Sequence, residues 1–280
     1  MTSNTTDAKQ STPAASRLIL TGPDRSRVDI YRYGAHVTSW IDRTGREQFF
    51  LSPLAGYSNG VSIRGGIPVV FPQFAMNGPL PKHGLLRTRV WDVTHQDTSS
   101  AIFRITDDDA TRKLWPYRFL AELHVTLSDT LTVALHVTNT GDSPFTFTSA
   151  LHNYFHVDDV SAAAVEGLTG CAYRDKVIDG PAIIDTARAV HIDGETDRVY
   201  IDGPREVHIT NVAGDRALHI AASGFGDWVV WNPGPELTKQ LADMEPEGYR
   251  RMLCVEAALV RAPQTLAPGT TWVGTQQLRT

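Results

Sequence analysis

Apolar and polar residues alternate along much of the chain, in short runs separated by turn-forming residues. In Leu131–Asn139, the apolar side chains of Leu131, Val133, Leu135 and Val137 fall on one face and the intervening residues on the other. This period of two is typical of a half-buried strand, and a Thr-Gly-Asp turn signal follows it. Similar runs predict strands at Val28–Tyr33, Ala101–Ile105, Leu120–Leu127, Phe145–Ala150, Glu206–Thr210, Ala217–Ala221, Asp227–Trp231, Met252–Val260 and Thr271–Leu278.

Helical periodicity is weak by comparison. Pro235–Met244 has the composition of a short helix, but no long stretch repeats apolar residues every 3.6 positions. Many strands without alternating helices predict an all-β protein, in which antiparallel strands form a sandwich or a large twisted double sheet. Residues 1–16 lack bulky apolar residues after Met1 and predict a disordered tail, which leaves residues 17–280 as a single domain.

Composition narrows the class of protein further. No apolar segment near the start resembles a secretion signal, and no run of 18 apolar residues predicts a membrane span. Cys171 and Cys254 lie in apolar surroundings, which favours buried thiols over a disulfide framework. The sequence shows no Gly-rich dinucleotide fingerprint, no Walker-type phosphate loop and no zinc-ligand spacing. We therefore expect a cytoplasmic protein that needs no cofactor or metal.

One segment has an unusual charge. Residues 48–91 contain no Asp or Glu but hold Arg64, Lys82, His83, Arg87 and Arg89, within a chain of formal charge −5. This acid-free segment predicts a site for a small anion rather than for a nucleic acid or a membrane surface. Arginine binds phosphate or carboxylate with two parallel hydrogen bonds, and the glycines of the segment allow close backbone approach. A solvated basic loop is the alternative, which the interleaved bulky apolar residues disfavour.

Two residues are candidates for acid/base chemistry. Glu256 is the one carboxylate in the most apolar predicted strand, and burial there would raise its pKa toward that of a useful general base. A solvent-facing Glu on a half-buried strand is the alternative. His152 follows the strand Phe145–Ala150 among aromatic residues, and an imidazole can exchange protons near neutral pH. A hydrogen-bonded core histidine is the commoner role for such a residue.

Three further residues have a polar or aromatic character suited to sugars. Asp197 could accept hydrogen bonds from sugar hydroxyls, although a simple ion pair with Arg198 is the better reading of its neighbours alone. Trp228 and Trp231 could stack on sugar C–H surfaces, and a place in the core is equally compatible with their position.

The chain resembles the D-hexose-6-phosphate mutarotases, also called glucose-6-phosphate 1-epimerases, of the aldose 1-epimerase superfamily. The resemblance covers roughly residues 17–275 and rests on motifs that occur in the same order. They are Arg64-Gly-Gly-Ile-Pro, Pro72-Gln-Phe, His83-Gly-Leu-Leu-Arg87, Ala150-Leu-His-Asn-Tyr-Phe, Glu195-Thr-Asp-Arg, Val230-Trp-Asn-Pro and Cys254-Val-Glu-Ala-Ala. It implies a galactose-mutarotase-like β-supersandwich.

The resemblance also implies roles for individual residues. His152 and Glu256 match the catalytic pair, and the matches to sugar- and phosphate-contacting positions are Arg64, His83, Arg87 and Asp197. Gln73, in the second motif, and Lys82 are further candidates for substrate binding. The family commonly has Gln at the position of Lys82, and a bulky aromatic residue at the position of Gly234.

Mutarotation would interconvert the α and β anomers of a hexose 6-phosphate, glucose 6-phosphate above all. The anomeric hydroxyl loses a proton, the ring oxygen gains one, the ring opens, and it closes on the other face. We expect Glu256 to act as the base and His152 as the acid, on opposite sides of the hemiacetal. We also expect the protein to be a monomer. The alternatives are a non-catalytic sugar-phosphate-binding protein on the same fold and an aldose 1-epimerase for unphosphorylated sugar.

Overall fold

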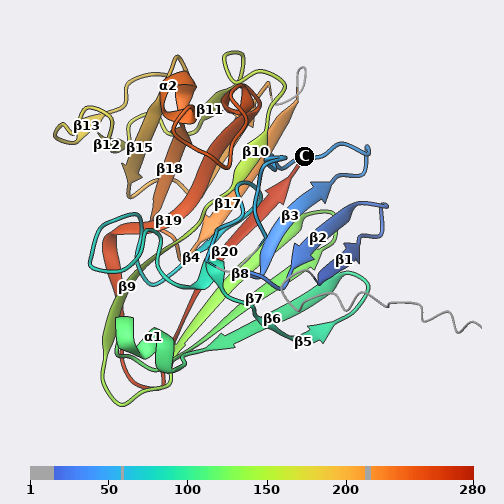
Figure 1. Ribbon diagram of the computed structural model, residues 1–280. Coiled ribbons are helices and arrows are strands. Elements are labelled where there is room, and N and C mark those ends of the chain that lie inside the picture. Colours follow the sequence, from blue (N-terminus) through green and yellow to red (C-terminus); the bar gives the residue numbers. More distant parts are fainter. Residues whose placement is uncertain (1–15, 58–59, 212–215) are drawn as a thin grey trace, which may run out of the picture.

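Antiparallel strands are the main secondary structure of the protein, as the sequence predicts (Figure 1). The structure is a computed structural model that describes residues 16–57, 60–211 and 216–280. Of the predicted tail it describes only Ser16, whose carbonyl accepts a hydrogen bond from the Arg32 amide; residues 1–15 lie outside the described residues. No helix among the described residues is long and apolar enough to span a membrane.

The strands belong to three sheets within the described part of the chain. A small sheet has the order β1–β2–β3 (Arg17–Thr21, Arg27–Tyr31, His36–Ile41). An eight-stranded sheet has the order β13 (Ile183–Ile184), β12 (Ala172–Asp175), β15 (Thr196–Ile201), β18 (Asp227–Asn232), β19 (Met252–Leu266), β9 (Phe145–Leu151), β4 (Val69–Val70), with β10 (Tyr154–His156) also paired to β19. A nine-stranded sheet has the order β14 (Ala189–His191), β11 (Ala164–Glu166), β16 (Glu206–Thr210), β17 (Ala217–Ser223), β20 (Thr271–Arg279), β8 (Leu131–Asn139), β7 (Phe119–Leu127), β6 (Ser100–Thr106), β5 (Asp92–Gln96).

The main apolar core draws on all three sheets. In β8, the side chains predicted to share a face are buried, and they join one core cluster with alternate residues of β7, β16, β17 and β19. In β19, Val255 and Ala257 belong to this core, so Glu256 between them points to the opposite face of the strand. That opposite face matters for function, because it carries Glu256.

All ten predicted strands are confirmed, and one is considerably longer than expected. β19 continues to Leu266 because a bulge between Leu259 and Gln264 interrupts its pairing with β9 without ending the strand. The buried carboxylate of Asp227 accepts hydrogen bonds from the amides of Val260 and Arg261, at 2.8 and 2.7 Å, and so satisfies the backbone of the bulge. The predicted strand ends at Val260 because this support comes from Asp227, which is remote in the sequence.

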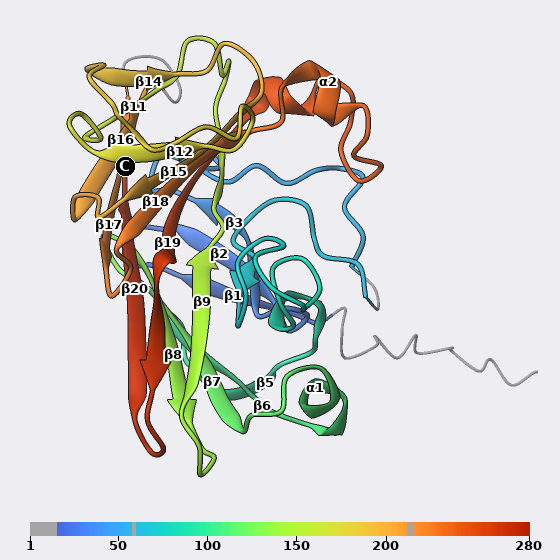
Figure 2. The same ribbon diagram turned by 90° about the vertical axis from the view of Figure 1, so that its left-hand side faces the viewer.

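The helices are few and short. α1 (Asp109–Leu114) and α2 (Gly234–Thr238) lie at opposite ends of the molecule (Figures 1 and 2), and two 3₁₀ turns, η2 (Leu86–Thr88) and η3 (Gly248–Arg251), complete the list for the described residues. The helix predicted at Pro235–Met244 is mostly wrong. After α2 the chain forms 3₁₀-type turns, in which the amides of Gln240 and Leu241 donate to the carbonyls three residues back.

Gly234, where the family resemblance predicts an aromatic side chain, cannot carry one here. The residue is buried with φ +59°, and a Cβ atom would lie 2.5 Å from the backbone nitrogen of Glu195.

The thiols of Cys171 and Cys254 are both free. Cys254 is buried as predicted, whereas Cys171 is partly exposed at the edge of the core.

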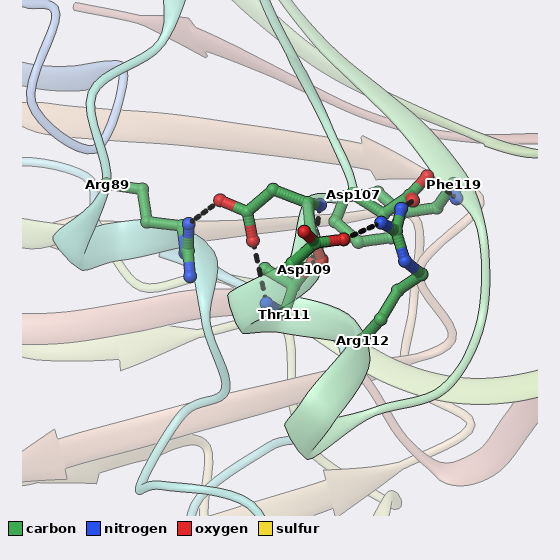
Figure 3. A network of polar contacts seen from close by, with 7 residues as sticks. Arg89, Asp107, Asp109, Thr111, Arg112 and Phe119 are labelled. Atoms are coloured by element: carbon green, nitrogen blue, oxygen red, sulfur yellow. Dashed lines mark hydrogen bonds and ion pairs between the residues drawn. The ribbon is translucent and has the colours of Figure 1, made fainter.

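Arg89, the last cation of the acid-free segment, is used in the fold. Its guanidinium lies 2.5 Å from the carboxylate of Asp108, which caps α1 by accepting a hydrogen bond from the Thr111 amide at 2.7 Å. Figure 3 shows Arg89 and Thr111 on either side of this cap. Arg89 therefore links the end of η2 to α1 instead of contributing to a ligand site.

Candidate functional site

The other basic residues of the acid-free segment surround a cavity on the outer face of the eight-stranded sheet. We call it the basic cavity. Its lining residues are Ser62, Arg64, Phe74, Ala75, Lys82, His83, Arg87, His152, Tyr154, Lys176, Asp197, Val229, Trp231 and Glu256. Seven of the eight residues that the sequence singles out as catalytic or substrate-binding are among them. The exception is Gln73.

Three neighbouring strands provide the floor of the basic cavity. Asp197 on β15 pairs directly with Trp231 on β18, and Val229 on β18 pairs with Glu256 on β19. Residues directly opposite each other in paired strands point to the same face of the sheet. The register of the sheet therefore brings the two carboxylates and the indole together, although 59 residues separate Asp197 from Glu256.

Glu256 is almost completely buried, with 1% of its surface exposed. Burial, together with the nearby carboxylate of Asp197, raises the pKa of Glu256 well above its ordinary value. Its Oε2 atom has no hydrogen-bond partner among the described residues. The alternative of a solvent-facing Glu is therefore wrong, and the residue holds a proton more tightly than an ordinary carboxylate.

His152 lies beside Glu256, with 3.4 Å between its Nδ1 and the Glu256 Oε1. It follows the last residue of β9, and its ring stacks on Tyr154 at a centroid distance of 4.8 Å and an interplanar angle of 6°. Burial and the positive surroundings, with contributions from His83, Arg87 and Arg64, lower the pKa of His152 well below its usual value. The structure thus brings the two candidate acid/base residues side by side at the same cavity.

His83 lies against His152 on a tightly folded loop. It has φ +65°, which is uncommon for a residue with a side chain, and Gly84 follows at φ +77°. A Cβ on Gly84 would lie 2.1 Å from the Phe71 carbonyl oxygen, so only glycine fits. The Ala75 amide donates to His83 Nδ1 at 3.3 Å. Burial and the adjacent cations, Arg87 first, lower the pKa of His83 to about 2, so the ring is neutral and its Nε2 carries the hydrogen.

Arg64 is held in place by two side chains that carry no role in the sequence analysis. Its Nη1 donates to the Tyr154 hydroxyl at 2.9 Å, and its Nη2 lies 3.1 Å from the Asp243 carboxylate. Its Nε is buried without a hydrogen-bond partner among the described residues. Tyr154 lies within a recognised motif, but nothing in the sequence links Asp243, in the loop after α2, to Arg64.

Arg87 and Lys82 come from the loop that carries His83. Arg87, on η2, donates from Nη2 to the Lys82 carbonyl at 2.7 Å, which fixes the guanidinium beside the cavity. Burial and the neighbouring arginines lower the pKa of Lys82, and burial together with Arg64 lowers that of Arg87. The charged forms of Lys82 and Arg87 are thus disfavoured by burial and by neighbouring cations, a condition that a bound anion would relieve.

Lys176 is the cation that the sequence analysis misses. It follows β12, and its Nζ lies 3.5 Å from the Asp197 carboxylate and 5.7 Å from the centre of the Phe74 ring. The predicted pairing of Asp197 with Arg198 is wrong, because adjacent strand residues point to opposite faces and Arg198 lies 3.5 Å from Asp175. Lys176 stands in no motif, and only the pairing of β12 with β15 brings it to the cavity.

Gln73 and Trp228 do not reach the basic cavity. The Gln73 side chain is buried and hydrogen-bonds the backbone of its own loop, donating to the carbonyls of Ala75 and Leu80 and accepting from the Leu80 amide. It holds the loop instead of contacting a ligand, so its prediction as a binding residue is wrong for this structure. Trp228 is buried in the core, whereas Trp231 lines the cavity, with its ring 6.1 Å from that of His152.

A larger recess near the end of β20 lacks this chemistry. Its volume is about 440 Å³, against about 120 Å³ for the basic cavity. Its charged residues Arg43, Arg46, Glu47 and Asp158 are exposed, and none of its lining residues forms a buried acid/base pair. The basic cavity is smaller, but it combines buried proton-exchanging groups with four cations. It is therefore the better candidate for a catalytic site.

Comparison with known proteins is consistent over the whole described chain. The family model described as aldose 1-epimerase matches residues 16–279. A protein of Cenchrus ciliaris, provisionally named a glucose-6-phosphate 1-epimerase, is 34% identical over 92% of this chain and 82% of its own length. A protein of Escherichia coli K12 with the same provisional name is also 34% identical, over 82% of this chain and 79% of its own length.

Solved structures have the same architecture. The crystal structure of a provisionally named mutarotase from Salmonella typhimurium superposes with a TM-score of 0.86 at 29% identity, covering 96% of this chain and 94% of that one. A galactose mutarotase related enzyme from Lactobacillus acidophilus, at 14% identity, shows the same fold with a TM-score of 0.76. The β-supersandwich that the resemblance implies is thereby confirmed.

The burial of Glu256 makes a prediction about stability. Its folded-state pKa lies above the ordinary value of 4.5, so the folded protein binds the proton more tightly than the unfolded chain. The stability gained from this tighter proton binding is fully present below the ordinary pKa and is lost as the pH rises through the folded-state pKa. We expect Glu256→Gln to raise Tm at neutral pH, by a margin that shrinks toward acid pH.

Thermal unfolding followed by circular dichroism over a pH series measures this margin. Glu236→Gln, at an exposed carboxylate on α2, is the matched control and should leave Tm nearly unchanged at every pH. A Glu256→Gln variant that is less stable than the wild type at neutral pH would show that the carboxylate is well compensated in the folded protein.

Proposed function

Because the chain belongs to the aldose 1-epimerase family, we propose that it interconverts the α and β anomers of hexose 6-phosphates, glucose 6-phosphate first among them. The observation that carries the proposal is the buried contact between Glu256 and His152 in a cavity with four cations around it. The pair supplies the acid and the base of ring opening, and the cations supply a place for the phosphate.

The spacing of the pair suits the two oxygens that exchange protons. The anomeric hydroxyl and the ring oxygen of a pyranose are bonded to the same carbon, so one acid/base group near each can serve both proton transfers. Glu256 and His152, 3.4 Å apart, can reach these two oxygens without any movement of the strands.

The pair exchanges a single proton. The raised pKa of Glu256 and the lowered pKa of His152 both favour a neutral carboxylic acid beside a neutral imidazole. Transfer of that proton from Oε1 to Nδ1 creates the carboxylate base and the imidazolium acid. Glu256 then takes the proton of the anomeric hydroxyl while His152 protonates the ring oxygen, so ring opening leaves both side chains neutral again. Ring closure on the other face reverses both transfers, and return of the proton from Nδ1 to Oε1 restores the starting pair.

The cations provide the selectivity for a phosphorylated sugar. Arg64 and Arg87 are fixed by neighbouring groups, so their donors are already oriented when an anion arrives. Lys82 and Lys176 add two further positive charges on the rim. Binding energy from a phosphate distant from the reacting carbon can orient the hemiacetal against Glu256 and His152.

Three residues remain to hold the sugar ring itself. His83 presents a neutral imidazole, Asp197 a carboxylate, and Trp231 an indole ring, all on the cavity wall next to His152. We assign hydroxyl contacts to His83 and Asp197, and contact with the C–H face of the sugar to Trp231. None of these roles needs a metal or an organic cofactor.

The proposal is tested by the rate of anomer exchange. We expect the purified protein to accelerate exchange of glucose 6-phosphate, followed by NMR exchange spectroscopy, and to act on free glucose much more slowly. An exchange rate equal to the spontaneous background with tightly bound glucose 6-phosphate would favour the non-catalytic binding protein. Equal acceleration of both sugars would favour an aldose 1-epimerase for unphosphorylated substrates.

Substitutions of the pair test the assignment of the chemistry. We expect Glu256→Gln and His152→Asn each to reduce kcat for glucose 6-phosphate by about a hundredfold or more, because a positioned acid or base contributes on that scale. Glu236→Gln and His95→Asn, both at exposed positions, are the matched controls and should retain full turnover. Near-normal kcat in a folded Glu256 or His152 variant would mean that another residue exchanges the proton.

Substitution of Arg87 tests recognition of the phosphate. A charge-assisted hydrogen bond is worth roughly 1.5–3 kcal/mol, so Arg87→Ala should lower kcat/KM for glucose 6-phosphate by about ten- to a hundredfold. Residual activity on free glucose should change far less. Arg89→Ala removes a neighbouring arginine that pairs with Asp108 outside the cavity, and should spare both activities. Equal losses on both sugars for Arg87→Ala would show that this residue shapes the loop and does not bind phosphate.

A further inference from the structure

Two histidines and a glutamate converge on the outer face of the nine-stranded sheet, away from the basic cavity. Glu206 and His208 lie on β16, and His219 lies directly opposite His208 on β17. The intervening residues, Val207 on β16 and Leu218 and Ile220 on β17, belong to the apolar core. The period of two therefore directs all three polar side chains to the outer face of the adjacent strands β16 and β17.

The side chains of this cluster are already close together. One ligand-type atom from each residue lies within 4.8 Å of the other two. His219 Nδ1 lies 2.9 Å from Glu206 Oε1, and the two imidazole rings have centroids 5.2 Å apart. His208 Nδ1 is buried and has no hydrogen-bond partner among the described residues. A lone pair or proton on a buried nitrogen without a partner is costly, and a bound ion would satisfy it.

We propose that Glu206, His208 and His219 form a binding site for a divalent transition-metal ion, with zinc as the ion that fits best. Two imidazoles and one carboxylate are a ligand set that zinc accepts, and water completes its coordination in an open site. The ion takes the place of the proton between His219 Nδ1 and Glu206 Oε1, and this proton leaves to solvent on binding.

The geometry requires only small adjustments. Zinc binds nitrogen and oxygen at about 2.0–2.2 Å, so ligand atoms as far as 4.8 Å apart need to approach by roughly 1–1.5 Å, whereas His219 Nδ1 and Glu206 Oε1, now 2.9 Å apart, need to separate slightly. Glu206 is 45% and His219 34% exposed, which leaves both side chains free to rotate and an ion free to enter. Arg279 on β20 lies directly opposite His219 and so is a cation on the same face, which makes its charge part of what the ion must overcome.

Sequence spacing gives no sign of this site. Zinc motifs are recognised by short intervals between ligands, whereas His208 and His219 meet only through the register of β16 and β17. The sequence-based expectation of a protein without a metal site is thus revised at this position. The site is distinct from the proposed catalytic one, which lies on the other large sheet, so its metal would stabilise the β16–β17 pair and leave anomer exchange untouched.

The same sheet provides a matched control. Glu122, His124 and His136 lie on β7 and β8, with the two rings stacked at 4.2 Å. The three residue types are identical to those of the proposed site, but among the described residues this second set does not bring three ligand atoms together. Removing its histidines changes the number of surface imidazoles without changing the proposed site.

Calorimetric titration of zinc into the full chain, produced without a polyhistidine tag and stripped with chelator, tests the proposal near neutral pH. We expect one tight equivalent in the wild type and in His124→Ala/His136→Ala. In His208→Ala/His219→Ala the affinity should fall by more than the roughly 10–100-fold that loss of an outer-shell partner costs. Glu206→Gln should weaken binding while both imidazoles remain.

Two additional measurements connect binding to geometry. Cobalt substituted for zinc should give the visible absorption of a low-coordinate site in the wild type and lose it in the His208/His219 double variant. Zinc should raise Tm in the wild type and not in the double variant, because an ion that binds only the folded state stabilises it. Identical titrations for wild type and His208→Ala/His219→Ala, or no tight equivalent in the wild type, would overturn the proposal. The rate of anomer exchange serves as the folding control, since none of these residues lines the basic cavity.

Discussion

The burial of one carboxylate determines how the rest of the basic cavity is built. Glu256 projects from an apolar strand into a space with almost no solvent, where an uncompensated charge would be costly. Among the described residues, the one charge-pairing contact of Glu256 is that with His152, at 3.4 Å. A proton is the least costly compensation, and a group that must hold or pass a proton in order to stay buried is suited to proton transfer.

Specific backbone and side-chain contacts hold the cations around this pair in fixed positions. Arg64 is held by Tyr154 and Asp243, Arg87 by the Lys82 carbonyl, and Lys176 by Asp197. Left free, four positive charges at one cavity would repel each other and spread over the surface. Burial and nearby arginine charge disfavour the cationic forms of Lys82 and Arg87, so an anion that enters the cavity stabilises these two cations.

Sequence reasoning predicts the parts of this structure that depend on local pattern. Alternation identifies β8 and nine other strands, and the single carboxylate in an apolar run identifies Glu256. Lys176 and Asp243 are invisible because strand register and a loop after α2 bring them to the site. Gln73 belongs to a motif, yet its side chain hydrogen-bonds the backbone of its own loop and does not line the cavity. The short strands from β10 to β15 contain two to six residues, too few to establish a period of two.

The arginines also act on the proton affinity of His152 at a distance. Burial and His83 lower the pKa of its imidazole, and Arg87 and Arg64 lower it further. A phosphate held between them would cancel their charge and so make the imidazolium easier to form. The phosphate then becomes a switchable counter-ion for the reaction at the other end of the sugar: its presence changes kcat as well as KM. On this reasoning, free glucose with inorganic phosphate bound beside it should react faster than free glucose alone, as two fragments that together reproduce the natural substrate.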